Sequence, residues 1–167
     1  MNQVVSLTEW IQQLSSGAPT QRIAAATHLA RLGTGAQVAA IPLIAACAAN
    51  DETATWAAEA LESLGPPALT DAHALAEMLT SESEESAYWA ATLLGRLGPS
   101  AAACVAALAR ALAPSRPLSV RQRAAWALGK IGGAARSAQP TLQSLMHESD
   151  ARLARLAQEA LEQIDPY

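Results

Sequence analysis

Histidine and cysteine, the side chains that most often bind metals or act as nucleophiles, are few and scattered in this chain. The cysteines Cys47 and Cys104 form no Cys-x-x-Cys pair. The histidines His28, His73 and His147 lie far apart along the sequence. No Gly-rich phosphate loop, Gly-x-Ser-x-Gly elbow or zinc-ligand spacing is present. We therefore expect no catalytic residue, no metal and no cofactor, and the chain is predicted not to be an enzyme.

Tryptophan and arginine are the side chains here whose chemistry suits binding instead. Tryptophan buries a large area at a low entropy cost and is enriched at the energetic centres of protein interfaces. Three of the four tryptophans, Trp56, Trp89 and Trp126, recur at intervals close to one another in length. Whether they share a surface depends on the elements that carry them.

The composition predicts that these elements are helices. The chain has 167 residues and a mass of 17.3 kDa, enough for one core, and contains 41 Ala and 22 Leu against 5 Val, 6 Ile and no Phe. Ala and Leu favour helices, whereas the residues that suit a sheet are scarce. We expect no membrane span, because no stretch approaches about 20 uncharged apolar residues. No secretory signal is visible in the first residues, so a cytoplasmic location is expected.

An internal repeat of 32 to 34 residues organises the helices. It is marked by Leu32-Gly33, Leu64-Gly65, Leu97-Gly98, Ile131-Gly132 and a degenerate Ile164-Asp165. A Leu stands three residues before each closing Leu or Ile, and an Ala stands seven residues before it. These offsets share one face of a helix with 3.6 residues per turn, so we expect them to form the core.

Each repeat is predicted to be a helix–turn–helix unit. Gly directly after the last apolar residue is a helix-stop signal, and further Ala and Leu columns after the Gly indicate a second helix in each period. The expected units form one domain over residues 1–167. Their boundaries are 1–33, 34–65, 66–98, 99–132 and 133–167.

The sequence of the fourth unit, from Val120-Arg121 to Ile131-Gly132, resembles a HEAT-like repeat of the short type named after phycobilisome lyases. The segments 22–33 and 88–98 resemble it as well, whereas the Thr-Pro-Leu-His motif of ankyrin repeats is absent. The resemblance implies an all-α, right-handed α-solenoid whose second helices line the concave face. In such repeats the Arg of the Val-Arg pair, here Arg22 and Arg121, ties neighbouring units together. The other units carry Ala54, Ala87 and Ala154 at this position.

Helical geometry then predicts an exposed stripe at eight, five and one residues before each closing residue. We expect partner-binding residues there, with Glu52, Glu59 and Glu85 at their acidic end. The predicted partner-binding residues are Trp56, Trp89, Arg96, Arg123, Trp126 and Lys130. Two interpretations remain open, because the tryptophans of this stripe either contact a partner or pack between neighbouring second helices. Trp10, at helical spacing with Leu7, Ile11 and Leu14, is expected in the core.

Charge is unevenly distributed along the chain. Residues 34–95 contain nine acidic residues and no Lys or Arg, whereas residues 96–147 contain seven basic residues and no Asp or Glu. The net charge of −4 conceals this polarity. Three interpretations remain open: chance sorting on a solvated surface, a basic patch for an acidic partner, or head-to-tail self-association. The expected patch comprises Arg96, Arg121, Arg123, Lys130 and Arg136.

The favoured function is a non-catalytic scaffold or adaptor that binds a protein partner on the concave face. An accessory subunit of a bilin lyase-type or chaperone-like complex is the alternative, although both cysteines are expected to be buried and inert rather than attached to a bilin. A di-iron enzyme of HEAT-like repeats would need several His-Glu dyads, and only His147-Glu148 is present. Nucleic-acid binding, as in HEAT-like DNA glycosylases, is disfavoured because the pI is near 5.3 and residues 96–147 supply no catalytic acid.

Overall fold

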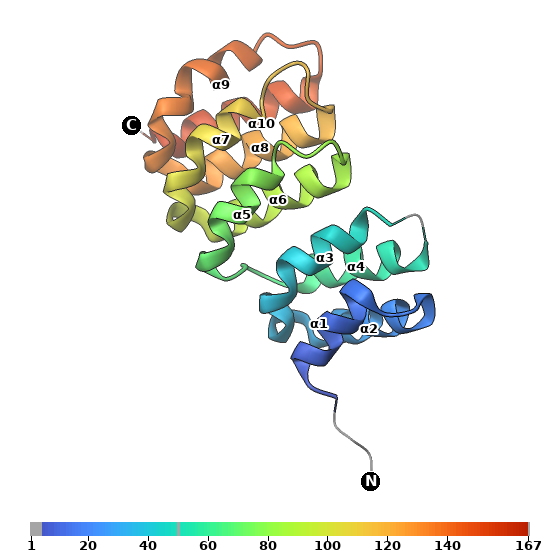
Figure 1. Cartoon of the computed structure of the whole chain (residues 1–167). Coiled ribbons are helices and arrows are strands. Elements are labelled where there is room, and N and C mark those ends of the chain that lie inside the picture. Colours follow the sequence, from blue (N-terminus) through green and yellow to red (C-terminus); the bar gives the residue numbers. More distant parts are fainter. Residues whose placement is uncertain (1–4, 50, 167) are drawn as a thin grey trace. The chain divides into compact units, whose positions relative to one another are not determined.

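The computed structural model describes residues 5–49 and 51–166, and within these residues it contains α-helices and 3-10 helices but no strand (Figure 1). The chain forms two compact units, Met1–Ala68 and Leu69–Tyr167. All five predicted helix pairs are present, two in the first unit and three in the second. That residues 1–167 form a single domain stays a prediction.

The first unit holds two helix pairs. The helices are α1 (Leu7–Ser16), α2 (Pro19–Leu32), the 3-10 helix η1 (Gly33–Ala39), α3 (Ala40–Cys47) and α4 (Glu52–Ser63). The second helices α2 and α4 pack against each other, and each contacts the first helix of its own pair. Leu14 is buried as expected, whereas Trp10 is only half-buried and stacks on His28 with ring centroids 4.5 Å apart.

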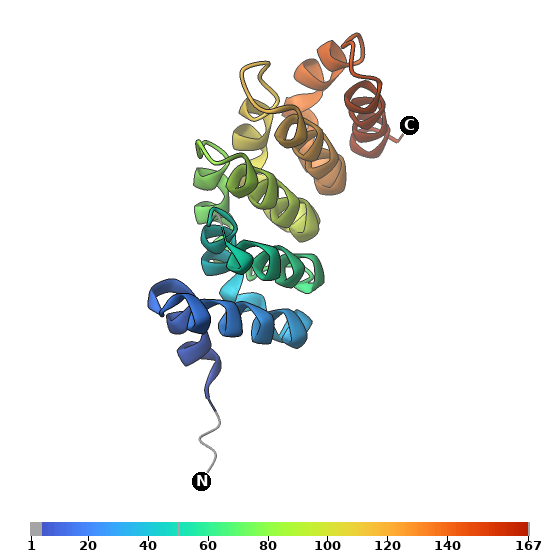
Figure 2. The same ribbon diagram turned by 90° about the vertical axis from the view of Figure 1, so that its right-hand side faces the viewer.

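The second unit holds three helix pairs. They are η2 (Leu69–Asp71), α5 (Ala72–Met78), α6 (Glu84–Leu97), η3 (Gly98–Cys104), α7 (Val105–Arg110), α8 (Leu118–Ile131), η4 (Gly132–Ala138), α9 (Gln139–Leu145) and α10 (Ala151–Ile164). Figure 2 shows α6, α8 and α10 following one another along one side of this unit, with α5, α7 and α9 along the other. The central helix α8 packs against α6, α7 and α10, so it is enclosed on three sides.

The predicted helix stops are confirmed. Gly33, Gly65, Gly98 and Gly132 all have a positive φ, between 52° and 75°, which L side chains rarely adopt. Each lies one residue beyond the closing Leu or Ile of a second helix or of its last turn. The chain therefore reverses into the next unit at the positions that the repeat indicates.

The predicted core columns are buried with few exceptions. The Ala seven residues before each closing residue is fully buried in all five units, and the Leu three residues before it is fully buried in four. Leu161 and the closing Leu97 are half-buried, and the closing Leu32 is 40% exposed. The other members of these three columns are all buried.

Two stretches, Pro19–Cys47 and Glu84–Arg110, are long and apolar enough to cross a membrane by length and composition, which the sequence analysis did not expect. Each stretch consists of two α-helices joined through a 3-10 helix. Gly33 in the first and Gly98 in the second have a positive φ and end the preceding α-helix. About half or less of each apolar window is buried. The prediction that no membrane is involved is not tested.

Candidate functional site

The predicted stripe is divided between the two units. Trp56 lies on α4 in the first unit, where it is half-buried and its indole Nε1 donates a hydrogen bond to Glu52 Oε1 at 3.2 Å. Trp89 and Arg96 lie on α6, and Arg123, Trp126 and Lys130 lie on α8, all in the second unit.

Trp89 is not on an exposed stripe, and this prediction is wrong. Only 4% of its surface is exposed, and its ring meets Tyr88 edge to face with centroids 5.4 Å apart. Thr92, predicted on the same stripe, is equally buried, and its hydroxyl donates to the Tyr88 carbonyl. The physical reason is that α6 is buried without a break from Trp89 to Gly95, so it has no single apolar stripe. Little of the Trp89 ring is left for a partner.

The Trp126 side chain packs against α6 and is also partly exposed at the surface. Its ring lies on the bare backbone of Gly95 in α6, so a Cβ at Gly95 would come within 2.8 Å of the indole Cε3 and 3.1 Å of the Ala127 Cα. Arg123 Cζ lies 5.3 Å and Lys130 Nζ 5.9 Å from the indole centroid, close enough for cation–π attraction. Trp126 is half-buried as a result. The packing interpretation of this tryptophan therefore holds in part, and partner contact stays a prediction.

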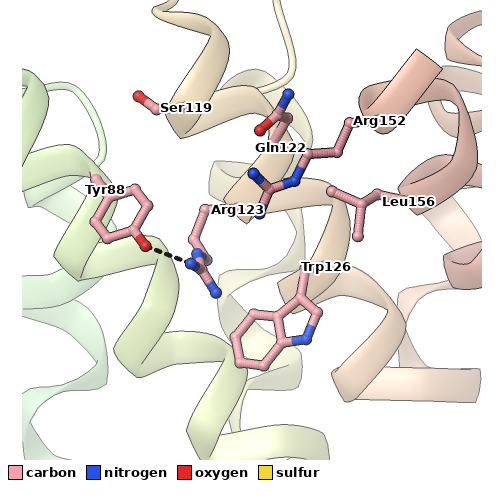
Figure 3. A pocket seen from close by; sticks show the side chains of 7 residues that line it. All are labelled: Tyr88, Ser119, Gln122, Arg123, Trp126, Arg152 and Leu156. Carbon is pink, nitrogen blue, oxygen red and sulfur yellow. Dashed lines mark hydrogen bonds between the residues drawn. The ribbon is translucent and has the colours of Figure 1, made fainter. Parts of the chain in front are cut away.

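A pocket of about 170 Å³ opens beside Trp126, between three successive second helices (Figure 3). We call it the α6–α8–α10 pocket. It is lined by Tyr88 from α6, by Ser119, Gln122, Arg123 and Trp126 from α8, and by Arg152 and Leu156 from α10. It presents an indole, an isobutyl side chain, two guanidinium groups and three neutral polar groups, with no carboxylate in its lining.

Hydrogen bonds to neighbouring helices hold the lining side chains in place. Arg123 donates to the Tyr88 hydroxyl, and its Cζ lies 4.7 Å from the Tyr88 ring centroid. The Gln122 amide donates to Asp150 at the start of α10. The Ser119 hydroxyl is hydrogen-bonded to Glu84 at the start of α6. The pocket is thus cross-linked to both helices that flank α8.

Of the six predicted partner-binding residues, only Arg123 and Trp126 line this pocket. Lys130 is exposed, with its Nζ near the Trp126 ring but outside the pocket lining, and Arg96 is half-buried on α6. Leu156 lies on the predicted stripe, eight residues before Ile164, although it was not among the predicted partner-binding residues. The lining residues outside the predicted stripe are Tyr88, Ser119, Gln122 and Arg152. Ser119 and Arg152 both stand twelve residues before a closing Ile, one helical turn beyond the stripe that was predicted, and extending the stripe would have found them.

Comparison with known proteins identifies the repeat. The family model for HEAT repeats matches residues 72–162, more than half of the chain. The chain belongs to the HEAT repeat family. No curated protein sequence matches it.

Solved structures share this HEAT-repeat fold. The complex of CpcE and CpcF of phycocyanin lyase from Nostoc sp. PCC7120 aligns with a TM-score of 0.69 and 24% identity, over 99% of this chain and 67% of that one. A designed armadillo repeat protein in complex with the peptide (KR)4 aligns with a TM-score of 0.66 and 16% identity, over 95% and 82%. An engineered protein aligns with a TM-score of 0.64 and 22% identity, over 95% and 78%. At these identities the likeness establishes the fold, an α-solenoid of a kind typical of interaction scaffolds.

The arginine that ties HEAT repeats together does so here. In the fourth repeat Arg121 is 8% exposed, and its guanidinium donates to the Leu112 carbonyl at 3.0 Å and to Glu148 Oε1 at 2.6 Å. Glu148 lies in the loop of the fifth repeat, so the contact crosses between repeats. In the first repeat Arg22 reaches Asp51 of the next repeat at 3.8 Å.

The predicted basic patch is smaller than the sequence suggested. Arg121 is buried in its ion pair, so it cannot belong to an exposed patch. Arg136 pairs with Asp165 at 3.5 Å and is partly neutralised by it. The reason is that Glu148, in the loop before α10, and Asp165, directly after α10, place carboxylates beside a stretch that has none of its own.

In the part of the chain that the structure describes, the side chains that could bind a metal or act as nucleophiles are not arranged as a metal or catalytic site. Within residues 5–49 and 51–166, no group of three or more His, Cys, Asp or Glu side chains is arranged so that it could hold a metal ion. Both cysteines are buried as predicted. Burial raises the pKa of the Cys104 thiol, which donates to the Ala72 carbonyl at 3.4 Å. This lowers its nucleophilicity near neutral pH.

Proposed function

We propose that this HEAT-repeat chain is a non-catalytic protein-interaction module that binds its partner on the second-helix face of the unit Leu69–Tyr167, over the α6–α8–α10 pocket. One observation carries the proposal. The pocket places the indole of Trp126 between helices that also supply the guanidinium groups of Arg123 and Arg152. Tryptophan and arginine set in a concavity are the side chains that contribute most to protein interfaces.

The chemistry of the lining supports binding rather than catalysis. Guanidinium groups stay protonated, so Arg123 and Arg152 cannot act as general bases. The pocket lining contains no histidine, cysteine or carboxylate, and the carboxylate that is bonded to the Ser119 hydroxyl, that of Glu84, lies outside the lining. The cross-links from α8 to α6 and α10 hold the surface in one conformation, which lowers the entropy cost of binding.

Affinity capture from the lysate of the source organism tests this function. The baits are the wild-type chain, Arg152→Glu in the pocket, and Arg110→Glu as a matched control on α7, along the other side of the same unit. We expect a protein that is recovered by the wild type and by Arg110→Glu but lost with Arg152→Glu. Equal recovery by all three baits, with unchanged helical circular dichroism, would refute this contact surface.

A further inference from the structure

The polar groups around the Trp126 indole are mainly hydrogen-bond donors. Arg123 and Arg152 offer guanidinium N–H groups, and Figure 3 shows the Arg152 guanidinium extending from α10 toward α8. The Tyr88 hydroxyl accepts its bond from Arg123, so its own proton is available to donate. A group that fits among these donors must be an acceptor.

The positive charge of this pocket is only partly balanced. Within residues 5–49 and 51–166, neither Arg123 nor Arg152 forms an ion pair with a carboxylate. Two acidic residues at the edge of the pocket form hydrogen bonds to groups other than these arginines: Glu84 bonds Ser119, and Asp150 accepts from Gln122 and from the Leu153 N–H. Asp150 also interacts electrostatically with Arg152, so its carboxylate offsets part of the positive charge of that guanidinium.

These observations define the ligand group. We propose that the α6–α8–α10 pocket binds a glutamate side chain in an acidic peptide segment of the partner protein. This inference rests on the proposed function and names the chemistry of that partner. The carboxylate lies between the guanidinium groups of Arg123 and Arg152, where planar donors match its two oxygens. The glutamate methylenes pack against Trp126 and Leu156.

Two alternative occupants fit less well. A phosphate group carries nearly two negative charges, whereas Asp150 already reduces the positive charge beside Arg152. A second copy of this chain would have to offer its own acidic stretch. There Asp51 lies beside Arg22, and Glu52 accepts from the Trp56 indole, so two of its nine carboxylates are already occupied.

Fluorescence polarisation with labelled peptides tests the proposal. The probes are a Gly/Ser peptide with four glutamates, the same peptide with four glutamines, and the same peptide with phosphoserines. We expect the glutamate peptide to bind most tightly and to lose affinity at higher salt. Arg152→Gln should weaken it about tenfold, the value of one charge-assisted hydrogen bond. The matched control Arg155→Gln removes the same charge from the same helix outside the pocket lining, and it should weaken binding less than twofold.

Each alternative result overturns the proposal in a distinct way. Equal binding of the glutamine peptide excludes an anionic ligand, and tighter binding of the phosphopeptide makes phosphate the ligand. Equal losses in Arg152→Gln and Arg155→Gln place the peptide outside the pocket. A wild-type dimer in sedimentation velocity that Arg152→Gln dissociates makes a second copy the occupant. If the lysate partner is lost with Arg152→Glu but the glutamate peptide does not bind, the proposed function stands and only the carboxylate chemistry fails.

Discussion

Replacing Gly95 with alanine tests how closely α6 and α8 approach, because two opposing effects decide the sign of the stability change. Alanine is better than glycine in the interior of a helix by about 1 kcal/mol. The new methyl group, however, would overlap the Trp126 ring and would lie 3.1 Å from the Ala127 Cα. Overpacking of this kind costs about 1–3 kcal/mol. We therefore expect Gly95→Ala to destabilise the chain by about 1 kcal/mol, a decrease in Tm of roughly 2–4 °C.

Removing the indole should reverse the sign of the stability change caused by Gly95→Ala. In a Trp126→Ala background the overlap with the indole is gone, so Gly95→Ala should become neutral or should stabilise by up to about 1 kcal/mol. The coupling between the two sites is then about 1–2 kcal/mol, within the range for residues in direct contact. Urea unfolding followed by circular dichroism on the four proteins of the cycle measures it.

Gly133→Ala is the control for the Gly95 cycle, because the nearest atom to its added Cβ, the Ile164 carbonyl oxygen, lies at 3.8 Å. That substitution should change stability by less than about 0.5 kcal/mol, as is usual away from packed sites. If Gly95→Ala stabilised the chain equally with and without the indole, Trp126 would not pack on α6 as described, and the support of the pocket by this contact would be refuted.

Three further predictions follow from the contacts between repeats and within helices. Arg121→Ala should lower the free energy of unfolding by about 3 kcal/mol, because it leaves Glu148 without its buried partner. Arg22→Ala, at the equivalent but more exposed position, should cost less than about 1 kcal/mol, and urea unfolding distinguishes the two variants. The Leu153 N–H, and next the Gln122 amide, lower the pKa of Asp150 in the folded chain. The stabilisation that ionised Asp150 contributes is therefore fully present above about pH 4, the pKa of an aspartate in the unfolded chain, and is lost as the pH falls through the lower pKa of the folded chain. The variant Asp150→Asn keeps a capping oxygen but does not titrate. Its Tm should therefore decrease less between pH 5 and pH 3 than the Tm of the wild type. Cys104 should resist Ellman's reagent at pH 8 until the chain is unfolded, and rapid native labelling would contradict its burial.

The repeat fold was predictable because its determinants are local. The spacing of Ala25 and Leu29 before the end of α2 places both on one helix face, and both are fully buried. Gly98 and Gly132 stop their helices through their own φ angles, whatever packs beside them. Periodicity and turn chemistry need no knowledge of neighbouring helices, so five helix pairs could be counted from the sequence.

The candidate site was only half predictable because it depends on contacts between helices. Trp89 stands opposite the predicted core face, yet it is buried because nearly the whole circumference of α6 is covered between Trp89 and Gly95. Arg121 appeared to belong to a basic surface, but its partner Glu148 is contributed by the next repeat. Arg152 completes the pocket from α10, a helix outside the basic stretch of residues 96–147. To predict contacts of this kind, one must know the register between neighbouring second helices, which the spacing within one helix does not determine.

The contact between Trp126 and Gly95 also makes these repeats non-interchangeable. The position two residues before the closing Leu or Ile is Gly95 in the third repeat but Glu162 in the fifth. A rearranged gene that placed the fifth repeat before the fourth would set a glutamate side chain where the indole needs bare backbone. A repeat placed directly before the fourth therefore needs glycine at this position, which the third and fourth repeats supply with Gly95 and Gly129, whereas any other repeat would require a compensating change there.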